Sequence, residues 1–446
     1  MTTTSSFRVR RSARAAIGAG TLGIALLGGG CAFQRTAKEV RTAAKLGVIA
    51  GTVKPAPGAD KTYVLLFAMP PKGKVEVTGV AELSELSDQW GFVCPEGEEF
   101  VLGAFRDVNG DGVRNPGEPA GYLGADTPLM LGAGVRLRDV TIDISPATKN
   151  DPRLPLDVTG DVGARRAALR FSMGEILTLD DQRFSDDNLS KGLWTPLTAL
   201  RENGGGIYFL EPYDPNRVPV LFVHGIGGSP RDLRVPIEKL DRSRFQPWVF
   251  FYPSGFRLQT IANGLSRNLP RLREKLGFKT VYVVAHSMGG LVSRRAILDM
   301  DNDPKARDIV GLFVTVSSPL AGHSAVKWGL AMTPEPVPAW IDLDPDSAFI
   351  KALAHPLPDR VPYYMLFGFR RGSNMFMPSS SDSVVPVESE LPMWAQRQAI
   401  RIWGFDEDHM KILTDDEAVA ILLGILERTA DAAGQTAPTA GAAPPR

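Results

Sequence analysis

One serine in this chain is placed by its surroundings at a sharp turn between a strand and a helix. The apolar run at residues 281–284 leads directly into the motif A-H-S-M-G-G at residues 285–290. Small residues two positions before and two positions after the serine, Ala285 and Gly289, let such a turn close and expose the hydroxyl above a sheet. A serine hydroxyl becomes a good nucleophile only when a neighbouring base accepts its proton. The motif therefore predicts an α/β core with Ser287 as a candidate nucleophile.

From about residue 217 onward, near-continuous apolar runs alternate with amphipathic segments. The runs lie at residues 218–223, 245–251, 281–284, 311–316, 363–367 and 400–403. Strands that are apolar on both faces and separated by helices are typical of a parallel sheet covered on both sides. We therefore predict a mostly parallel, doubly wound α/β domain over residues 217–430.

The preceding part of the chain has a different pattern. Short β-rich runs separated by turn residues lie at residues 63–67, 75–77, 100–102 and 135–142. Because no helical pattern separates these runs, residues 53–146 are expected to form a small β-sandwich. At 446 residues the chain is long enough for two domains with flanking segments. We expect a tether at residues 31–52, a mixed connector at residues 147–216 and a disordered tail at residues 431–446.

The first 30 residues have the composition of an export signal. Four arginines precede a short apolar stretch at residues 15–27, and small residues follow up to Cys31. This order is typical of a signal peptide, and the apolar stretch is short for a membrane span, so an uncleaved anchor is the weaker alternative. The G-G-G-C motif at residues 28–31 resembles a bacterial lipobox, although its leucine, Leu27, stands one place early. The resemblance implies an exported protein held at the cell-envelope membrane through an acylated Cys31.

Charge and cysteine content argue against nucleic-acid binding and against an intrachain disulfide. Lys and Arg total 50 and Asp and Glu total 50, so the formal net charge is zero. Nucleic-acid binding needs a basic surface, and we therefore expect no nucleic-acid partner. Cys94 is the only cysteine besides Cys31, so acylation of Cys31 leaves no pair for an intrachain disulfide.

An acidic loop inside the expected β-sandwich has the spacing of a calcium-binding loop. Asp107, Asn109, Asp111 and Glu118 stand at loop positions 1, 3, 5 and 12, and Gly112 stands at position 6. The flanking sequence reads as strand rather than helix, and the loop resembles the D-x-N-x-D-G loops of secreted bacterial β-domains. Two interpretations stay open: a structural calcium site, or a polar turn whose side chains bond their own backbone. The missing helices weigh slightly toward the turn.

A glycine-rich turn, V-H-G-I-G-G-S at residues 223–229, follows the first core strand. Such a turn can direct a backbone N–H toward an oxygen that becomes negative during acyl transfer. The second N–H of such a site belongs to the residue after the nucleophile. Ile226 and Met288 are therefore the candidate oxyanion donors, and His224 is expected to be structural. A phosphate-binding loop is a weak alternative because no Lys-Ser/Thr pair follows the glycines.

An acid and then a histidine should follow the nucleophile in chain order. Asp382 lies in the loop after the run at residues 363–367, and His409 lies in the loop after the run at residues 400–403. His409 is the only histidine that follows Asp382, which supports its assignment as the base. Asp382 would orient this histidine and stabilise its charged form.

Other acids and histidines are weaker candidates. Three aspartates come before the strand at residues 363–367 and rank behind Asp382 on strand order: Asp342, Asp344 and Asp346. His286 occupies the variable position of the serine turn and is poorly placed to act on its neighbour. His323 follows a core strand and is expected to line the pocket, whereas His355 is assigned no role.

These motifs in this order make residues 217–430 similar to α/β-hydrolases of the bacterial lipase/esterase type, some of which share the A-x-S-x-G variant. The resemblance implies the α/β-hydrolase fold and a triad of Ser287, His409 and Asp382. It implies oxyanion donation from Ile226 and Met288, no cofactor for catalysis, and an ester substrate with a lipid or apolar acyl group. The N-terminal β-domain lies outside the resemblance.

Residues 319–360 contain Trp328, Trp340 and Phe349 between two core strands. This insertion resembles the cap, or lid, that covers the pocket of lipases, and the alternative is a surface excursion with its own small core. For the whole chain we expect an exported serine hydrolase that cleaves carboxylic esters. Two alternatives stay open: a cell-envelope acyltransferase, and a binding or scaffold protein that uses the fold without chemistry.

Overall fold

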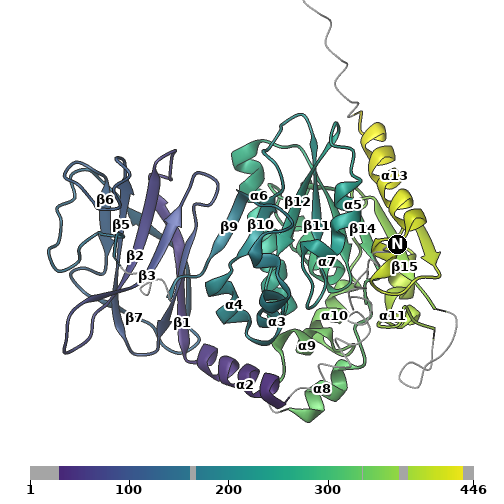
Figure 1. Ribbon diagram of the computed structural model, residues 1–446, viewed down its shortest axis with the longest axis horizontal. Helices are drawn as coiled ribbons and strands as arrows, with labels where there is room; N and C mark the ends of the chain where they lie inside the picture. The colour runs from purple at the N-terminus through teal and green to yellow at the C-terminus, as the bar shows by residue number, and fades with distance from the viewer. Residues whose placement is uncertain (1–29, 161–166, 334, 371–379, 435–446) are drawn as a thin grey trace, which may run out of the picture.

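The computed structural model describes residues 30–160, 167–333, 335–370 and 380–434. They form a β-domain and a larger α/β domain side by side, with helix α2 (Gly30–Ala44) running from one to the other (Figure 1). None of the helices in these ranges is both long and apolar enough to cross a membrane. Of the expected signal peptide only Gly30 is described, and the expected tail is described only up to residue 434.

The β-domain is a sandwich, as the sequence predicts. Its described strands form two sheets, in the orders β4-β1-β8 and β3-β2-β5-β6, with β7 paired to β5. The strands are β1 (Leu46–Lys54), β2 (Lys61–Ala68), β3 (Glu76–Leu83), β4 (Trp90–Pro95), β5 (Glu99–Asp107), β6 (Ala120–Leu123), β7 (Leu129–Met130) and β8 (Arg136–Asp143). Ile49 and Val53 of one sheet share a buried core with Val64 and Leu66 of the other. Alternate residues of β1 are buried, which is the two-residue period of a strand with one face in a core.

The α/β domain is built on a sheet of eight described strands in the order β16-β15-β14-β13-β11-β12-β10-β9. The strands are β9 (Phe171–Ile176), β10 (Gly205–Phe209), β11 (Val218–Val223), β12 (Phe245–Phe251), β13 (Val281–His286), β14 (Val310–Val316), β15 (Tyr363–Gly368) and β16 (Arg401–Phe405). The strands from β12 to β16 pair in parallel, and β10 pairs antiparallel with β12. Because parallel strands need crossover connections, helices must cover both faces.

Two segment boundaries differ from the expectation. β9 and β10 come from residues 147–216, expected as a connector, so the sheet begins before residue 217. The edge strand β9 is half exposed and β10 starts with two glycines, so neither shows the long apolar run of a central strand. Likewise, the expected tether at residues 31–52 contains α2 and most of β1.

Helices cover both faces of the large sheet. On one face α6 (Leu258–Leu276) and α7 (Met288–Asp301) bury apolar side chains such as Leu265 and Leu291. On the other face α5 (Arg234–Glu238) and α13 (Asp416–Ala432) do the same. The expected doubly wound, mostly parallel sheet is therefore confirmed. With Ser287 at the turn from β13 into α7, the fold is that of an α/β-hydrolase.

The described part of the 319–360 insertion forms short helices between β14 and β15. They are α8 (Val326–Met332), α9 (Pro338–Leu343) and α10 (Ala348–Leu353). Trp340 and Phe349 belong to the same buried cluster as the face of the large sheet. The insertion therefore does not have a separate core of its own.

Helix α2 packs against this insertion and against the first of the two α-helices between β9 and β10 (Figure 1). The ring of Phe33 lies edge-on to Trp194 of α3 (Asp186–Trp194), with 5.5 Å between centroids, and to Trp340 of α9, with 6.1 Å. The Thr36 hydroxyl donates to the Trp194 carbonyl at 2.9 Å. The segment after Cys31, expected to be a tether, is thus a helix packed on the α/β domain.

Arg294 of α7 joins the insertion to the sheet. Its side chain is fully buried, and its guanidinium donates to the carbonyls of Leu353 and His355 at 2.7 Å each and to the Gln398 side chain. It also lies over the Trp394 ring, 4.5 Å from the centroid. Burial lowers the pKa of Arg294 to about 10, so it stays charged at neutral pH. Its charged N–H groups satisfy carbonyls at the C-terminal end of α10 that have no partner within the helix.

Replacing Arg294 with methionine should lower the free energy of unfolding by roughly 2–4 kcal/mol, because buried carbonyls lose a charged donor. The matched control is Arg295→Met on the same helix, which breaks a partly exposed ion pair with Asp299. That change should cost less than about 1 kcal/mol. Urea denaturation of both variants gives the comparison, and equal losses would contradict the role assigned to Arg294.

Candidate active site

Ser287 stands at a strained turn between β13 and α7. Its backbone has φ 55 and ψ −130, a conformation that residues other than glycine seldom adopt. The turn is held because the Ser287 N–H donates to the Val316 carbonyl at 2.9 Å. A Cβ at Gly289 would lie 2.6 Å from the Val223 carbonyl oxygen, so only glycine fits there. Crowding against β11 therefore explains the small residue two places after the serine.

The structure brings the three predicted triad residues together. The Ser287 hydroxyl lies 2.9 Å from His409 Nε2, and His409 Nδ1 lies 2.5 Å from Asp382 Oδ2. The backbone N–H of His409 also donates to the Asp382 carbonyl at 2.8 Å. Asp382 is fully buried, and Ser287 and His409 are only 5% and 7% exposed. The arrangement links a hydroxyl, a base and a carboxylate in a site largely shielded from water.

Asp382 is prepared to carry a negative charge. Its Oδ1 accepts hydrogen bonds from the N–H groups of Val384 and Val385, at 2.9 and 2.6 Å. These come from a tight turn in which Ser383 has a positive φ. Burial alone would raise the pKa of Asp382, but the charge of His409 and its hydrogen bond outweigh burial and lower that pKa. Asp382 is therefore ionised at neutral pH.

The glycine-rich turn after β11 packs directly on Ser287. A Cβ at Gly225 would lie 2.8 Å from the Ser287 Cβ, so glycine is needed for this approach. In the described chain, neither the Ile226 N–H nor the Met288 N–H donates to another residue. Met288 is the first residue of α7, where backbone N–H groups lack helical partners and the helix dipole is positive. Both predicted donors are thus free in the two turns that meet at the serine.

The same turn is held by side chains around it. The Gly227 N–H donates to the Ser254 hydroxyl at 2.9 Å, and the Ser229 N–H donates to Asp232 at 2.9 Å. Asp232 and Ser229 form a capping box on the short helix that follows, Pro230–Leu233. Burial raises the pKa of Asp232 to about 6. These contacts fix the direction of the Ile226 N–H before any substrate binds.

His224 is structural, as expected. Its Nδ1–H donates to the Gly225 carbonyl at 2.8 Å, and its Nε2 accepts from the Tyr252 N–H at 3.3 Å. This pattern requires a neutral ring, and burial lowers the pKa of His224 to about 4. Tyr252, which sequence analysis missed, stacks on the ring and donates its hydroxyl to the His224 carbonyl at 2.5 Å.

The remaining histidines do not reach the serine hydroxyl. His286 donates from Nε2 to the His409 carbonyl at 2.9 Å, and burial lowers its pKa to about 3. His323 is 6% exposed and donates to the Val384 carbonyl at 2.8 Å, so it supports the loop of the acid rather than lining an open pocket. His355 is exposed.

The rival acids are engaged elsewhere. Asp342 of α9 is buried and paired with Arg257 at 2.6 Å. Asp344 and Asp346 both lie within 4 Å of the Lys327 ammonium. The ranking of the acids by strand order therefore identified the aspartate that contacts His409, Asp382.

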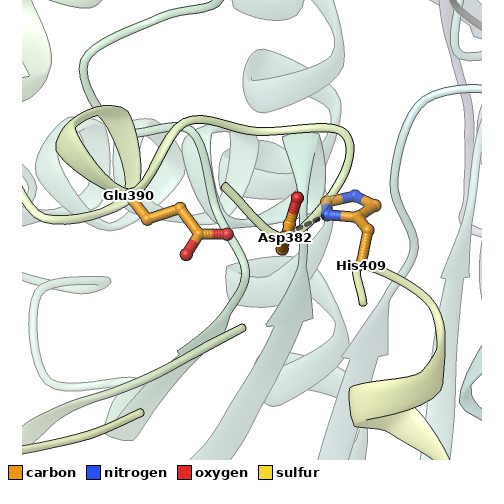
Figure 2. A group of neighbouring side chains, drawn as sticks. All are labelled: Asp382, Glu390 and His409. Atoms are coloured by element: carbon orange, nitrogen blue, oxygen red, sulfur yellow. Dashed lines mark hydrogen bonds and ion pairs between the residues drawn. The ribbon is translucent and has the colours of Figure 1, made fainter. Parts of the chain in front are cut away.

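Glu390 is the site residue that sequence analysis missed. It ends the short helix α11 (Val387–Glu390) and is 1% exposed. One ligand atom from each of Asp382, Glu390 and His409 lies within 4.8 Å of the other two (Figure 2). The only signal in the sequence is a glutamate eight residues after the acid, and this spacing belongs to no motif.

The acidic loop of the β-domain is a turn whose side chains bond its own backbone. The two Asp107 oxygens accept from the N–H groups of Gly110 and Gly112, at 2.8 and 2.9 Å. Glu118 accepts from the N–H groups of Val108 and Asn115, both at 2.7–2.8 Å. Asn109 and Asp111 likewise bond within the loop. The carboxylates of Asp107, Asp111 and Glu118 are not among the described groups whose ligand atoms gather within 4.8 Å. These are the bonds expected of the polar-turn interpretation, and calcium binding by Asp107, Asn109, Asp111 and Glu118 stays a prediction.

Comparison with known proteins places similar structures over half of the chain. The sequence matches no family model and no curated protein. The Bacillus licheniformis lipase BlEst2 in its propeptide form is 21% identical, with a TM-score of 0.37 over 48% of this chain and 51% of that chain. Aspergillus fumigatus lipase B is 17% identical, with a TM-score of 0.36 over 52% and 57%. The lin2722 gene product of Listeria innocua is 16% identical, with a TM-score of 0.37 over 48% and 94%.

The free energy of unfolding should fall as the pH drops from 6.5 to about 4, because His224 must stay neutral when folded. Burial lowers its pKa from 6.5 to about 4, so the stability present above pH 6.5 is lost through this window. At about 1.4 kcal/mol per pKa unit, the loss is on the order of 3 kcal/mol. Urea denaturation across this pH range should show a shallower slope for His224→Gln than for wild type.

The control for this measurement is His355→Gln, which alters an exposed ring and should keep the wild-type slope. A His224→Gln variant with an unchanged slope would show that the ring is not the group that titrates.

Proposed function

We propose that this chain is a serine hydrolase that cleaves carboxylic esters through an acyl-enzyme. One observation carries the proposal: the hydrogen-bonded series Ser287 Oγ, His409 Nε2, His409 Nδ1 and Asp382 Oδ2, with steps of 2.9 and 2.5 Å. The strained turn at Ser287 adds support, since it presents the hydroxyl at the carboxyl end of β13. A nucleophile, its base and an orienting acid in this order are the parts that acyl transfer needs.

In the proposed reaction His409 accepts the Ser287 proton while the serine oxygen attacks the ester carbonyl carbon. The carbonyl oxygen becomes negative and receives the N–H groups of Ile226 and Met288. His409 then gives its proton to the leaving alcohol, and the acyl group stays on Ser287. A water molecule, deprotonated by His409, attacks the acyl carbon. The bond to Ser287 Oγ then breaks, His409 returns the proton to that oxygen, and the acid leaves. Asp382 stays ionised throughout and stabilises the positive imidazole.

The proposed substrate is an ester with a lipid or other apolar acyl group. Ile226 supplies an apolar side chain in the turn beside Ser287. The Leu193 side chain also lies next to this turn, 4.0 Å from the position that a Cβ would take at Gly227. Burial of Ser287 and His409 also favours an acyl group that gains from leaving water.

We further propose that the protein is exported and anchored to a cell-envelope membrane through acylated Cys31. The lipobox-like motif at residues 28–31 supports this proposal. The position of Cys31 at the start of α2 is compatible with it, because α2 lies at one end of the α/β domain (Figure 1).

Ser287→Ala should abolish labelling by a fluorophosphonate probe and lower kcat for p-nitrophenyl esters by roughly 10⁴-fold or more. Asp382→Asn should lower kcat by about 10⁴-fold, since the histidine loses its orienting charge. The control is Ser324→Ala, an exposed serine of the insertion, which should behave as wild type.

Equal labelling of wild type and Ser287→Ala would refute the mechanism. The same assay with an added alcohol or amine acceptor separates hydrolysis from acyl transfer, because a transferase would form the acylated acceptor in preference to the free acid. A folded wild-type protein that neither labels nor turns over esters would favour the non-catalytic alternative.

Mass spectrometry of the mature protein should find a chain that starts at an acylated Cys31, and Cys31→Ser should move the protein from the membrane to the soluble fraction. The control Cys94→Ser changes a buried thiol of the β-sandwich and should leave the fractionation unchanged. A mature chain that retains Met1, or an unmodified Cys31, would contradict the anchor.

A further inference from the structure

Glu390 places a second carboxyl group next to the acid of the triad. The side chain is 1% exposed and extends from α11 toward Asp382, on the side away from His409 (Figure 2). The geometry brings one ligand atom from each of these three residues within 4.8 Å of the other two. Two acidic groups this close in a dry interior cannot both be ionised without a large electrostatic cost.

The hydrogen bonds decide which carboxyl group carries the charge. Asp382 accepts N–H donors from Val384, Val385 and His409, which stabilise its charged form. Neither oxygen of Glu390 accepts an N–H from the described chain, although both are buried. Burial raises the pKa of Glu390 well above its usual range, and the charge of Asp382 raises it further. The Ser317 hydroxyl is a weaker, opposing influence that lowers this pKa. A buried carboxyl group that accepts no N–H is more stable as the neutral acid, which has an O–H to donate.

We propose that Glu390 is a positioning residue, protonated in the active protein, that donates its O–H to the Asp382 carboxylate. This inference rests on the proposed function, because it assigns Glu390 a task in holding the catalytic acid. The bond would occupy a lone pair of Asp382 that the backbone leaves free. It thereby fixes the carboxylate plane so that Oδ2 stays directed at His409 Nδ1.

The surrounding elements hold Glu390 in this place. The neighbouring Ser389 hydroxyl donates to the Gly322 carbonyl, and the Ala321 N–H donates to the Ser389 carbonyl at 3.0 Å. These bonds attach α11 to the segment after β14. Glu390 is therefore held rigidly, so its carboxyl group has no route to solvent that would relieve the contact with Asp382.

A proton on Glu390 explains the close approach of Asp382, Glu390 and His409 better than a bound metal ion does. Asp382 and His409 already contact each other directly at 2.5 Å, which leaves no room for a cation between them. Binding a cation through His409 Nδ1 would break the bond that orients the base. A bound ion would therefore have to displace the Asp382–His409 hydrogen bond, whereas a proton on Glu390 leaves it in place. EDTA should inactivate the protein only if an ion is bound.

The test compares Glu390→Gln and Glu390→Leu in the full-length protein with a soluble ester. The glutamine amide can still donate an N–H to Asp382, so its kcat should stay within about threefold of wild type. Leucine removes the donor and should lower kcat about tenfold or more, with KM changed less than about twofold. A residue needed only for packing would not be rescued by glutamine in preference to leucine.

The matched controls are Glu388→Gln and Glu388→Leu, which change an exposed glutamate of the same helix and should leave kcat unaltered. Infrared difference spectra at neutral pH supply a readout independent of turnover. The wild-type protein should show the carbonyl stretch of a protonated carboxylic acid, and Glu390→Gln should lack it. Thermal unfolding of each variant verifies that it is folded.

Four outcomes would overturn the inference: equal losses in both Glu390 variants, wild-type kcat in Glu390→Leu, no protonated acid in the spectrum, or EDTA inactivation reversed by a divalent cation. Failure of the proposed function looks different. In that case wild type would neither label with fluorophosphonate nor turn over esters, while the infrared signal of Glu390 could still be measured.

Discussion

The parallel pairing of β11 with β13 is the constraint on which the site depends. Val223 lies opposite Ala285 in this ladder, so the turns that follow the two strands end at the same height. Gly225 then meets Ser287, and Gly289 meets the carbonyl of Val223, at distances that exclude a side chain on either glycine. The strained serine and the free N–H groups are consequences of this one contact. Asp382 and His409 then need only lie in the loops that follow β15 and β16 at the same edge of the sheet.

The interior around the triad contains one strong negative charge among groups that are kept neutral. His224 is held neutral because its two ring nitrogens take opposite hydrogen-bond roles, and burial opposes protonation of His286. Asp382, by contrast, has three N–H donors directed at its carboxylate. In a medium of low dielectric constant, a single carboxylate exerts a strong field on the imidazole that it contacts. The buried polar groups therefore concentrate electrostatic stabilisation at His409.

Sequence patterns were sufficient wherever function is tied to the end of a central strand. Ser287, Asp382 and His409 each follow an apolar run, and parallel strands bring such positions to one edge. The patterns failed where burial arises from long-range packing. β9 and β10 lie toward one edge, and their apolar residues are interrupted by polar residues or preceded by glycines. Glu390 lies on a four-residue helix without a motif. The spacing of the acidic loop predicted its side-chain oxygens at one turn, and the structure shows them bonded to the loop's own backbone.

The docking of α2 has a consequence for how the protein would work on a surface. An α-helix rises about 1.5 Å per residue, so Phe33 lies only about 3 Å along the axis from residue 31. Phe33 packs against Trp194 of α3 and against Trp340 of the insertion. A lipid attached at residue 31 would then hold the α/β domain close to the membrane, because little flexible chain separates the two. The domain could rotate about this attachment and diffuse laterally, but it could not move far from the bilayer, so the active site would stay at a high local concentration of membrane lipids.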